Sequence, residues 1–339
     1  MNSKKLTQNK IDIRKIWYYF TRHIDGFLLT FILVLMSVGL MVLYSASGGN
    51  IGKVNNQAIN IVVALILMWV IANTSMQQIK RIALPIYLIG LALLIGVALF
   101  GEIYNGARRW LNIGITRIQP SELMKIAIPL MMAWYFDKYE ITLRLRDYIG
   151  ATLLLVIPVL LILKQPDLGT ALLIAASGFY VLFFAGLSWR IIIGLIALGA
   201  ASLPILWGMM HDYQRQRVMT LLDPTQDPLG AGYHIIQSSI AIGSGGIAGK
   251  GWQNGTQTQL DFLPEQSTDF IFAVIAEERG FLGAGLVLLL FAVIIYRVLA
   301  ALPQVKDDFG CFVIVGAIGL LATEVFVNLA MNIGLLPVV

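Results

Sequence analysis

The chain has 339 residues, of which 58% are hydrophobic and only 13% charged, and its mean hydropathy is +0.79. Soluble proteins carry roughly 25% charged residues, so the composition excludes an ordinary soluble protein and indicates an all-α polytopic membrane protein. The formal net charge of +5 does not indicate nucleic-acid binding, because the basic residues gather in segments beside apolar runs. The single cysteine, Cys311, excludes an intrachain disulfide and argues against redox chemistry.

The first 26 residues are basic and lack the pattern of a removable signal peptide. Six lysines and arginines occur before residue 27, and no small-residue cleavage site follows a short apolar core. We therefore expect residues 1–26 to be a cytoplasmic tail in front of an uncleaved anchor. Residues 27–339 are then expected to form one transmembrane domain.

Nine segments of this domain are apolar enough to be candidate spans, since about 20 residues cross a bilayer. The candidates are Phe27–Tyr44, Ala58–Ala72, Ile82–Phe100, Ser121–Phe136, Tyr148–Leu163, Gly169–Leu187, Ile191–Met209, Phe270–Tyr296 and Phe309–Met331. The second and fourth are short, so their ends are the least defined.

The distribution of basic residues predicts the orientation. With the N-terminus inside, fourteen of the 24 lysines and arginines lie in the short cytoplasmic segments and eight in the longer outer ones. Nine spans would place the C-terminus outside. Because the chain stops at an apolar LLPVV with no polar tail, we expect a C-terminal truncation that removes a tenth span.

Three outward segments follow from this topology, at residues 101–120, 164–168 and 210–269. The last is about 60 residues long, far beyond an ordinary connection, and such loops are usually functional or disordered. It contains aromatic residues such as Tyr233, Trp252 and Phe262, together with apolar runs and glycine-rich turns. We therefore expect a structured outer loop between spans 7 and 8, with short helices on or in the bilayer surface.

Carboxylates at Asp261, Glu265 and Asp269 lead directly into the eighth span. Asp269 would suit helix N-capping, but acids at the mouth of a span also suit proton transfer, which is the role we favour for Asp269. Two further acids, Glu277 and Glu278, follow about two turns later. Arg279 could neutralise one of them, so we assign Glu277 and Arg279 a structural role around the cavity.

Glu122 and Lys125 stand three residues apart at the start of the fourth span, on one helix face. They could be an ordinary surface pair. Lys125, however, belongs to an apolar span, where a lone ammonium needs a partner or water. We therefore favour a buried pair beneath an outward cavity.

The outer segment before this span holds Arg108, Arg109, Trp110 and Arg117. Arginines beside an indole could clamp a phosphate and stack on a sugar, although interfacial anchoring explains most such residues. Lys164 and Asp167 add a second outward charged pair at a helix break. Pro166 and Gly169 explain that turn without any function.

Two other patterns are weak. The glycine-rich stretch Gly243–Gly251 resembles a phosphate-binding loop, but Lys250 is followed by glycine instead of Ser or Thr. The three histidines, His23, His211 and His234, are too scattered to form a metal site. No metal site is expected from the residues.

Four stretches together carry a family resemblance: ARRWLNIGITRIQPSELMKIA, KQPDLGTALLI, GYHIIQSSIAIGSGGIAGKGW and GTQTQLDFLPEQSTDFIFAVIAEE. They resemble the SEDS family (shape, elongation, division and sporulation), and the residues of these motifs are closer to those of its elongation member than to those of its division member. The resemblance runs from about Phe27 to Val339. It implies ten spans and a peptidoglycan glycosyltransferase that polymerises lipid II at the outer face of the bacterial cytoplasmic (inner) membrane.

The resemblance also implies residue roles. The essential aspartate of the family corresponds to Asp269, its fourth-span acid and lysine to Glu122 and Lys125, and its outer arginine and tryptophan to Arg109 and Trp110. A carboxylate can act as general base for a sugar hydroxyl, and cations must offset the diphosphate charge. Arg109, Lys125, Arg215 and Arg217 are candidates for that task. Attack on an α-linked diphosphate to give a β-1,4 bond implies inversion.

Two other functions stay open. A lipid II flippase or transporter would also place charges inside spans, and the stripe of Glu324, Asn328 and Asn332 along the ninth span favours such a path. A non-catalytic scaffold is the third possibility. The resemblance implies a class B penicillin-binding protein and the elongation machinery as partners. No cofactor is assigned, and a requirement for a divalent cation (Mg or Mn) stays open.

Overall fold

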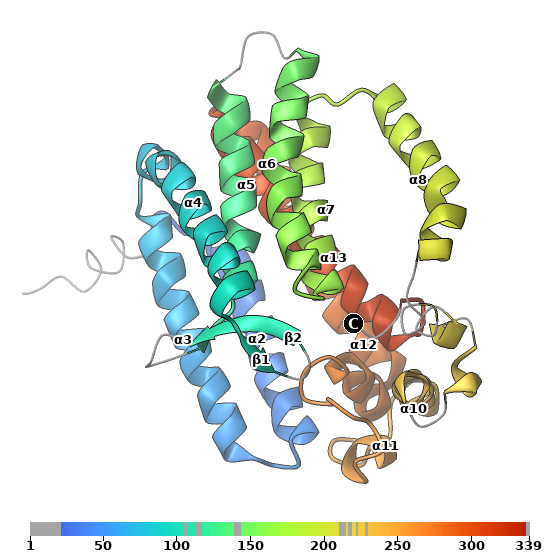
Figure 1. The fold of residues 1–339 in the computed structure, drawn as a ribbon. Helices are drawn as coiled ribbons and strands as arrows, with labels where there is room; N and C mark the ends of the chain where they lie inside the picture. The colour runs from blue at the N-terminus through green and yellow to red at the C-terminus, as the bar shows by residue number, and fades with distance from the viewer. Residues whose placement is uncertain are drawn as a thin grey trace, which may run out of the picture.

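The computed structural model describes residues 22–104, 107–112, 117–138, 144–209, 215, 219–221, 223–227 and 230–336. Nine long helices run up and down through this part of the chain (Figure 1). They are α2 (Gly26–Ala46), α3 (Ile51–Ala72), α4 (Met76–Phe100), α5 (Pro120–Lys138), α6 (Leu145–Leu163), α7 (Leu168–Phe184), α8 (Trp189–Met209), α12 (Ile271–Ala301) and α13 (Asp308–Asn332). Each overlaps one of the nine segments expected from the sequence.

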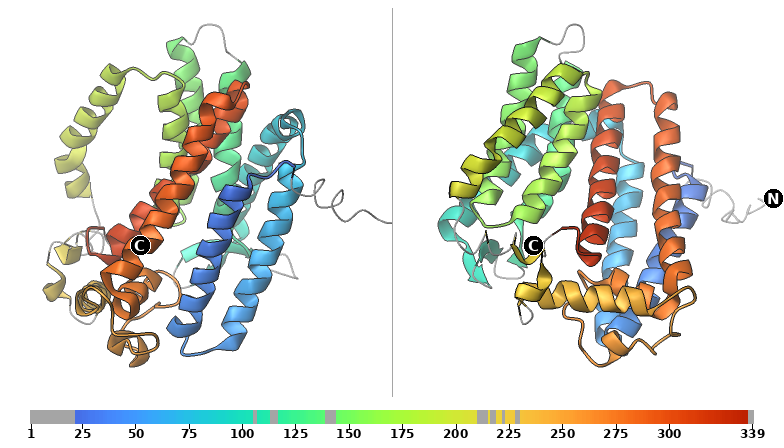
Figure 2. Two further views of the ribbon diagram at one scale, coloured as in Figure 1. Left: turned by 180° about the vertical axis from the view of Figure 1, so that it is seen from behind. Right: turned by 90° about the vertical axis from the view of Figure 1, so that its right-hand side faces the viewer.

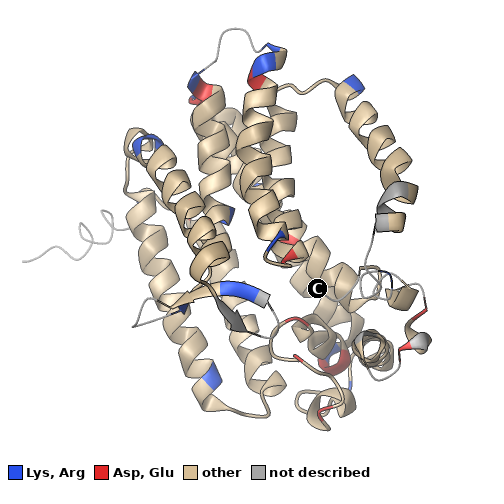
Figure 3. Ribbon diagram, in the orientation of Figure 1, with Lys and Arg blue, Asp and Glu red and all other residues tan. Residues whose placement is uncertain are grey.

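Within the described residues, six helices are long and apolar enough to cross a membrane: α2, α3, α4, α6, α12 and α13. Helix α7 and the described part of α8 are apolar but shorter. Helix α5 carries charged residues near both of its ends, including Glu122 and Lys138. Charged residues gather at the helix ends and around α12, and most of the intervening length is uncharged (Figure 3).

The protein core centres on α5, which is packed between α4, α6, α7 and α13. The side chains of Met124, Ile128 and Met132 are fully buried there. Helix α13 crosses close to α5 and α7 because it has glycines at the contacts. A Cβ at Gly319 would collide with the ring of Tyr180. In contrast, α2 and α3 expose apolar side chains along most of their length, as expected for surfaces that face lipid.

The structure corrects the expected element boundaries at α3. This helix begins at Ile51, seven residues before the predicted span, because Asn50 caps it by accepting a hydrogen bond from the backbone N–H of Lys53 (3.2 Å). Polar residues at 55–57 are thus helical although they lie outside the apolar run.

A small sheet corrects the purely α-helical prediction. Strands β1 (Glu102–Tyr104), β2 (Ala107–Asn112) and β3 (Arg117–Ile118) pair antiparallel in the order β1-β2-β3, between α4 and α5. In the β2–β3 pairing, Leu111 lies opposite Ile118. The sheet lies at one end of the bundle (Figure 1) and carries the arginine segment to that end.

The segment between α8 and α12 contains the expected short helices where it is described. They are η1 (Pro224–Gln226), α10 (Ala231–Ser244) and α11 (Thr256–Gln259), while η2 (Leu302–Gln304) follows α12. Helix α10 packs across α12 at the end of the bundle where α13 finishes (Figure 2). Helix α8 stands apart from the other long helices in Figure 1 and in the left view of Figure 2.

Candidate active site

A cavity of about 660 Å³ lies between α2, α7, α12 and α13, and α5 and β2 each contribute one residue to its lining. Most of its lining side chains are apolar, such as Leu35, Leu173 and Phe291. Its polar lining includes Arg109, Lys125, Asp167, Asp269, Glu324 and Asn328. The fold thus brings together acids and bases from β2, α5, α13 and the turns that precede α7 and α12.

Asp269 lies in the turn immediately before α12 and does not cap that helix. The cap position is Phe270, which makes no side-chain capping bond. Asn332, whose side chain is fully buried at the end of α13, holds this turn in place. Its Nδ2 donates to the carbonyl oxygen of Asp269 (2.8 Å), and its Oδ1 accepts from the backbone N–H of Ala273 (3.1 Å). The N-capping alternative for Asp269 is therefore excluded.

The carboxylate of Asp269 has an unusual electrostatic setting. Within the described residues, it accepts no hydrogen bond. The Asp269 side chain is accessible from the cavity, but the surrounding protein atoms partly remove it from bulk water. This desolvation is the main cause that raises the pKa of Asp269 above the ordinary value. The negative charge of Glu265 raises the pKa further, while His234 lowers it. A raised pKa suits a carboxylate that must accept a proton near neutral pH.

This setting predicts the pH dependence of any reaction that uses Asp269 as a base. The ionised form is the active one, so activity should fall as the pH drops through the raised pKa, above the 3.8 of an ordinary Asp. Glu265→Gln removes one cause of the shift and should move the acidic limb of the kcat/KM profile to lower pH. An acidic limb that stays in place in Glu265→Gln would contradict the assignment.

A second prediction concerns Asn332. Asn332→Leu keeps the side-chain size but removes its hydrogen bonds to the carbonyl of Asp269 and the N–H of Ala273, each worth about 0.5–1.5 kcal/mol. Asn328 and the carbonyl of Phe270 remain as partners of these two groups. We expect a lower unfolding temperature and slower turnover. Asn328→Leu is the matched control, because its bond to the same carbonyl is longer (3.3 Å) and more exposed. Equal effects of the two variants would refute the special role of Asn332.

Lys125 lies between two carboxylates. Its Nζ is 3.0 Å from Glu122, the contact expected from their spacing, and 3.1 Å from Glu324 on α13. Lys125 and Glu324 line the cavity, whereas Glu122 does not. The side chain of Glu122 is 54% exposed and that of Lys125 17%, so the expected burial of the pair is wrong for Glu122. The half-buried ammonium thus has two partners, one on α5 and one on α13.

Arg109 binds the turn between α6 and α7. Its Nε donates to the carbonyl of Gln165 (3.3 Å), its Nη2 donates to that of Pro166, and its Nη1 is 3.9 Å from Asp167. Asp167 also caps α7 by accepting from the N–H of Thr170 (3.2 Å). Arg109 therefore fixes one wall of the cavity while lining it.

The expected pair of Lys164 and Asp167 does not form. Asp167 contacts Arg109 and Gln119 instead (Nε2 to Oδ2 3.1 Å). Lys164 ends α6 and points away from the main cavity, lining a smaller apolar groove between α4 and α6. The reason is that Lys164 ends α6 and Asp167 begins α7, so the turn between these helices directs the two side chains to different sides.

The other predicted phosphate-binding residues are not brought to the cavity. Trp110 on β2 is partly buried and absent from the cavity lining, and Arg108 and Arg117 are exposed. Arg215 donates to the carbonyls of Trp207 (3.1 Å) and Gly208 (3.0 Å) at the end of α8. Arg217 lies outside the described residues.

The cluster of Glu277, Glu278 and Arg279 differs from the expectation. Glu277 is fully buried, but its ion-pair partner is Lys250 (2.8 Å) instead of Arg279. Glu278 is also buried and accepts a hydrogen bond from Ser45 of α2 (2.5 Å). Arg279 is exposed, and its charge acts on Glu278, so the expected neutralisation of one acid applies to Glu278. Glu277 thus has the expected buried position, but its partner is Lys250, 27 residues away in the sequence.

Comparisons with known proteins identify the family of this chain. Residues 26–339 match the model of the cell cycle protein family FtsW/RodA/SpoVE. The chain belongs to this family. It is 48% identical over 318 residues to the peptidoglycan glycosyltransferase MrdB of Escherichia coli K12, a match that covers 94% of this chain and 86% of that protein.

Two solved structures share the fold of this FtsW/RodA/SpoVE member. A chain of a peptidoglycan synthase complex, described as coordinating polymerization and crosslinking, superposes with a TM-score of 0.80 at 33% identity, covering 93% of this chain and 88% of that one. A variant of the rod shape determining protein RodA of Thermus thermophilus gives a TM-score of 0.68 at 28% identity, covering 93% and 87%. The resemblance to the SEDS family is thereby confirmed.

Sequence reasoning missed three residues of this family member's site. His234 on α10 was set aside with the other histidines, but its ring stacks on Phe270 (centroids 5.8 Å apart) and its charge acts on Asp269. Asn332 was recognised as part of the polar stripe on the ninth span, but not as a residue that binds the backbone of Asp269. Lys250 was set aside with the rejected phosphate loop. Only the stripe spacing of Asn332 carried any signal of its role.

The described residues contain no group of three or more His, Cys, Asp or Glu side chains arranged to hold a metal ion. The positive charge in the cavity of this family member comes from Arg109 and Lys125.

Proposed function

We propose that this protein is a peptidoglycan glycosyltransferase that polymerises lipid II into β-1,4 glycan strands during cell elongation. The observation that carries the proposal is the cavity in which Asp269, with its raised pKa, shares the lining with Lys125 and Arg109. Membership of the FtsW/RodA/SpoVE family and the likeness to a glycosyltransferase support it. The likeness to a rod shape determining protein supports the role in elongation.

The proposed reaction is a single displacement. The carboxylate of Asp269 takes the proton of a sugar 4-hydroxyl as that oxygen attacks the anomeric carbon of a sugar linked to undecaprenyl diphosphate. The bond between that carbon and the diphosphate oxygen breaks, and the diphosphate leaves with the electron pair. Attack from the face opposite the α-linked diphosphate inverts the configuration. The leaving group is a stable anion, so no second carboxylate is needed as an acid.

Charge in the cavity supports the departure of the diphosphate. Lys125 and Arg109 would interact with its oxygens, and the apolar lining lowers the local dielectric, which strengthens those interactions. Glu122 and Glu324 hold Lys125 in place. The apolar part of the cavity, between α2, α12 and α13, is suited to a polyprenyl chain.

We further propose that all nine long helices cross the membrane, with residues 1–26 in the cytoplasm and the cavity mouth at the outer face. The distribution of lysines and arginines supports this orientation. In a Cys311→Ser background, a cysteine introduced at residue 253 should react with a membrane-impermeant reagent added to intact spheroplasts. Labelling only after the spheroplasts are permeabilised would indicate the opposite orientation.

The proposed partner is a class B penicillin-binding protein of the elongation machinery, which would crosslink the new strand. The likeness to a chain of a peptidoglycan synthase complex supports this partner. A divalent cation, if required, would bind through the substrate diphosphate beside Arg109 and Lys125. A chelator should then abolish activity, and added magnesium or manganese should restore it.

The deciding experiment is reconstitution of the full-length protein with its partner, whose transpeptidase site is inactivated, followed by addition of lipid II. Glycan strands would support the polymerase. Absence of strands together with transfer of lipid II between liposome leaflets would instead indicate a flippase, which the stripe of Glu324, Asn328 and Asn332 also suits. Absence of both activities would indicate a scaffold.

A further inference from the structure

Helix α12 is broken at Gly280, which has φ 65° and ψ −165° inside an otherwise continuous apolar helix. The break divides it into a short half, residues 271–279, and a long half, residues 281–301. At 1.5 Å per residue the long half is about 31 Å long, enough by itself to cross the bilayer core. The long half can thus cross the membrane without the short half, which begins two residues after Asp269.

A helix break frees backbone groups that must find other partners. Here the segment 245–251 supplies them. The N–H groups of Lys250 and Gly251 donate to the carbonyls of Glu277 and Glu278 (both 3.0 Å), while those of Phe281 and Leu282 donate to the carbonyls of Gly246 (2.9 Å) and Ile247 (3.1 Å). The glycine-rich segment thus completes the broken helix.

Glycines in this segment permit the close backbone approach. A Cβ at Gly245 would collide with the carbonyl oxygen of Ala276, and one at Gly249 with that of Glu278. Gly249 also has a positive φ of 81°. The glycine pattern that superficially resembles a phosphate loop is therefore explained by helix packing.

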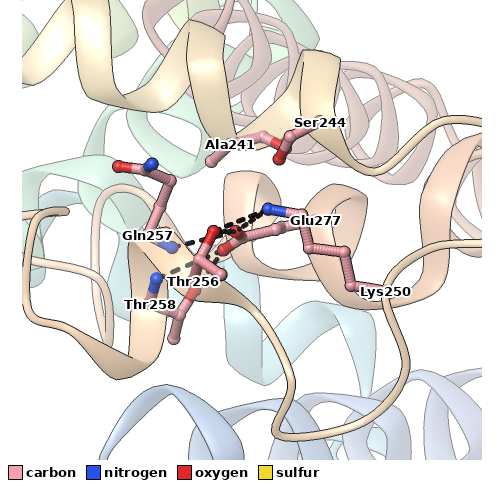
Figure 4. A network of polar contacts seen from close by, with 7 residues as sticks. All are labelled: Ala241, Ser244, Lys250, Thr256, Gln257, Thr258 and Glu277. Carbon is pink, nitrogen blue, oxygen red and sulfur yellow. Dashed lines mark hydrogen bonds and ion pairs between the residues drawn. The ribbon is translucent and has the colours of Figure 1, made fainter.

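A buried carboxylate joins this segment to the short half of α12 (Figure 4). Glu277 accepts hydrogen bonds from Lys250 Nζ (2.8 Å), Thr256 Oγ1 (3.2 Å), the N–H of Gln257 (2.9 Å), and the N–H (3.2 Å) and Oγ1 (2.9 Å) of Thr258. Four of these five donors are neutral. Lys250 alone supplies the counter-charge, and its Nζ also donates to Thr256 (2.7 Å).

We propose that the Lys250–Glu277 ion pair is a positioning device that sets the place of Asp269 for the reaction. The pair fixes residues 245–258 to the short half of α12, and this half ends at Asp269, about two turns from Glu277. Ser45, through Glu278, and Asn332 attach the same half-helix to α2 and α13. Because α12 is broken at Gly280, the position of the short half depends on these contacts and not on continuation of the long half. The proposal rests on the proposed function, in which Asp269 is the base.

The test uses Lys250→Met in the full-length protein bound to its partner, with amide hydrogen exchange and polymerisation kinetics as separate readouts. We expect the amides of residues 250, 251, 281 and 282 to exchange roughly tenfold faster. We also expect kcat to fall roughly ten- to hundredfold with KM for lipid II within about twofold, because a misplaced base slows the chemistry more than it weakens binding. Lys250→Arg keeps the charge and should restore most of kcat.

The matched control is Arg297→Met, which breaks an ion pair with Asp25 (2.6 Å) at the other end of the same helix and should leave kcat unchanged. Thr256→Val, which removes one neutral donor, serves if Lys250→Met does not fold, and should lower kcat severalfold. Unchanged exchange in these variants, or an equal loss of kcat in Arg297→Met, would overturn the positioning role. An inactive wild type would overturn the proposed function instead, while the exchange data would still decide whether the ion pair fixes the segment.

Discussion

Asp269→Asn is expected to abolish glycan polymerisation, with a loss in kcat of roughly 10²–10⁴-fold, the usual contribution of a positioned general base. The amide has nearly the shape of the carboxylate, so the turn held by Asn332 should keep its geometry. KM for lipid II should change little, because the substitution removes proton transfer and leaves the cavity in place. Polymerisation by the purified complex measures both quantities.

The same substitution should not destabilise the fold. The raised pKa of Asp269 means that the folded protein holds this proton more tightly than the unfolded chain does. Ionisation of Asp269 therefore opposes folding, an effect that develops as the pH rises from the ordinary value through the folded pKa. At neutral pH the unfolding temperature of Asp269→Asn should equal or exceed that of the wild type, and the difference should shrink in acid.

Asp307→Asn is a suitable control for Asp269→Asn, because Asp307 is an exposed acid that precedes α13 at the opposite end from the cavity. It should polymerise lipid II at the wild-type rate. A folded Asp269→Asn variant that also retains this rate would remove Asp269 from the mechanism.

Lys125→Met is the second substitution with a large expected effect. Loss of the ammonium leaves the carboxylates of Glu122 and Glu324 beside the site of the diphosphate, so a favourable charge is replaced by repulsion. We expect kcat/KM to fall by roughly 10²–10³-fold, as for removal of one transition-state donor. Lys125→Arg should retain part of the activity, because its charge is kept but its geometry differs.

A double variant separates charge from packing at this position. Adding Glu324→Gln to Lys125→Met removes one unpaired acid and should recover part of the lost stability without recovering catalysis. Glu122→Gln should have a milder effect than Glu324→Gln, because Glu122 is more exposed and lies outside the cavity lining. Recovery of full polymerisation in the double variant would show that Lys125 only neutralises its neighbours.

The sequence by itself determined those features that depend on local composition and helical spacing. Apolar runs located the nine long helices, because a segment that faces lipid must satisfy its backbone internally and expose apolar side chains. Spacing of three placed Glu122 beside Lys125. Family motifs pointed to Asp269, and the acid-to-apolar transition before α12 supported its selection.

Only the tertiary structure decided which distant groups meet. Lys250 pairs with Glu277, Asn332 binds the turn of Asp269, and Arg109 holds the turn before Asp167 while Lys164 faces another groove. These contacts join residues tens of positions apart, and no helical or strand period relates such positions. They depend on how α12 breaks at Gly280, where the glycines at 245 and 249 let the backbone approach closely, and on how α13 packs against its neighbours.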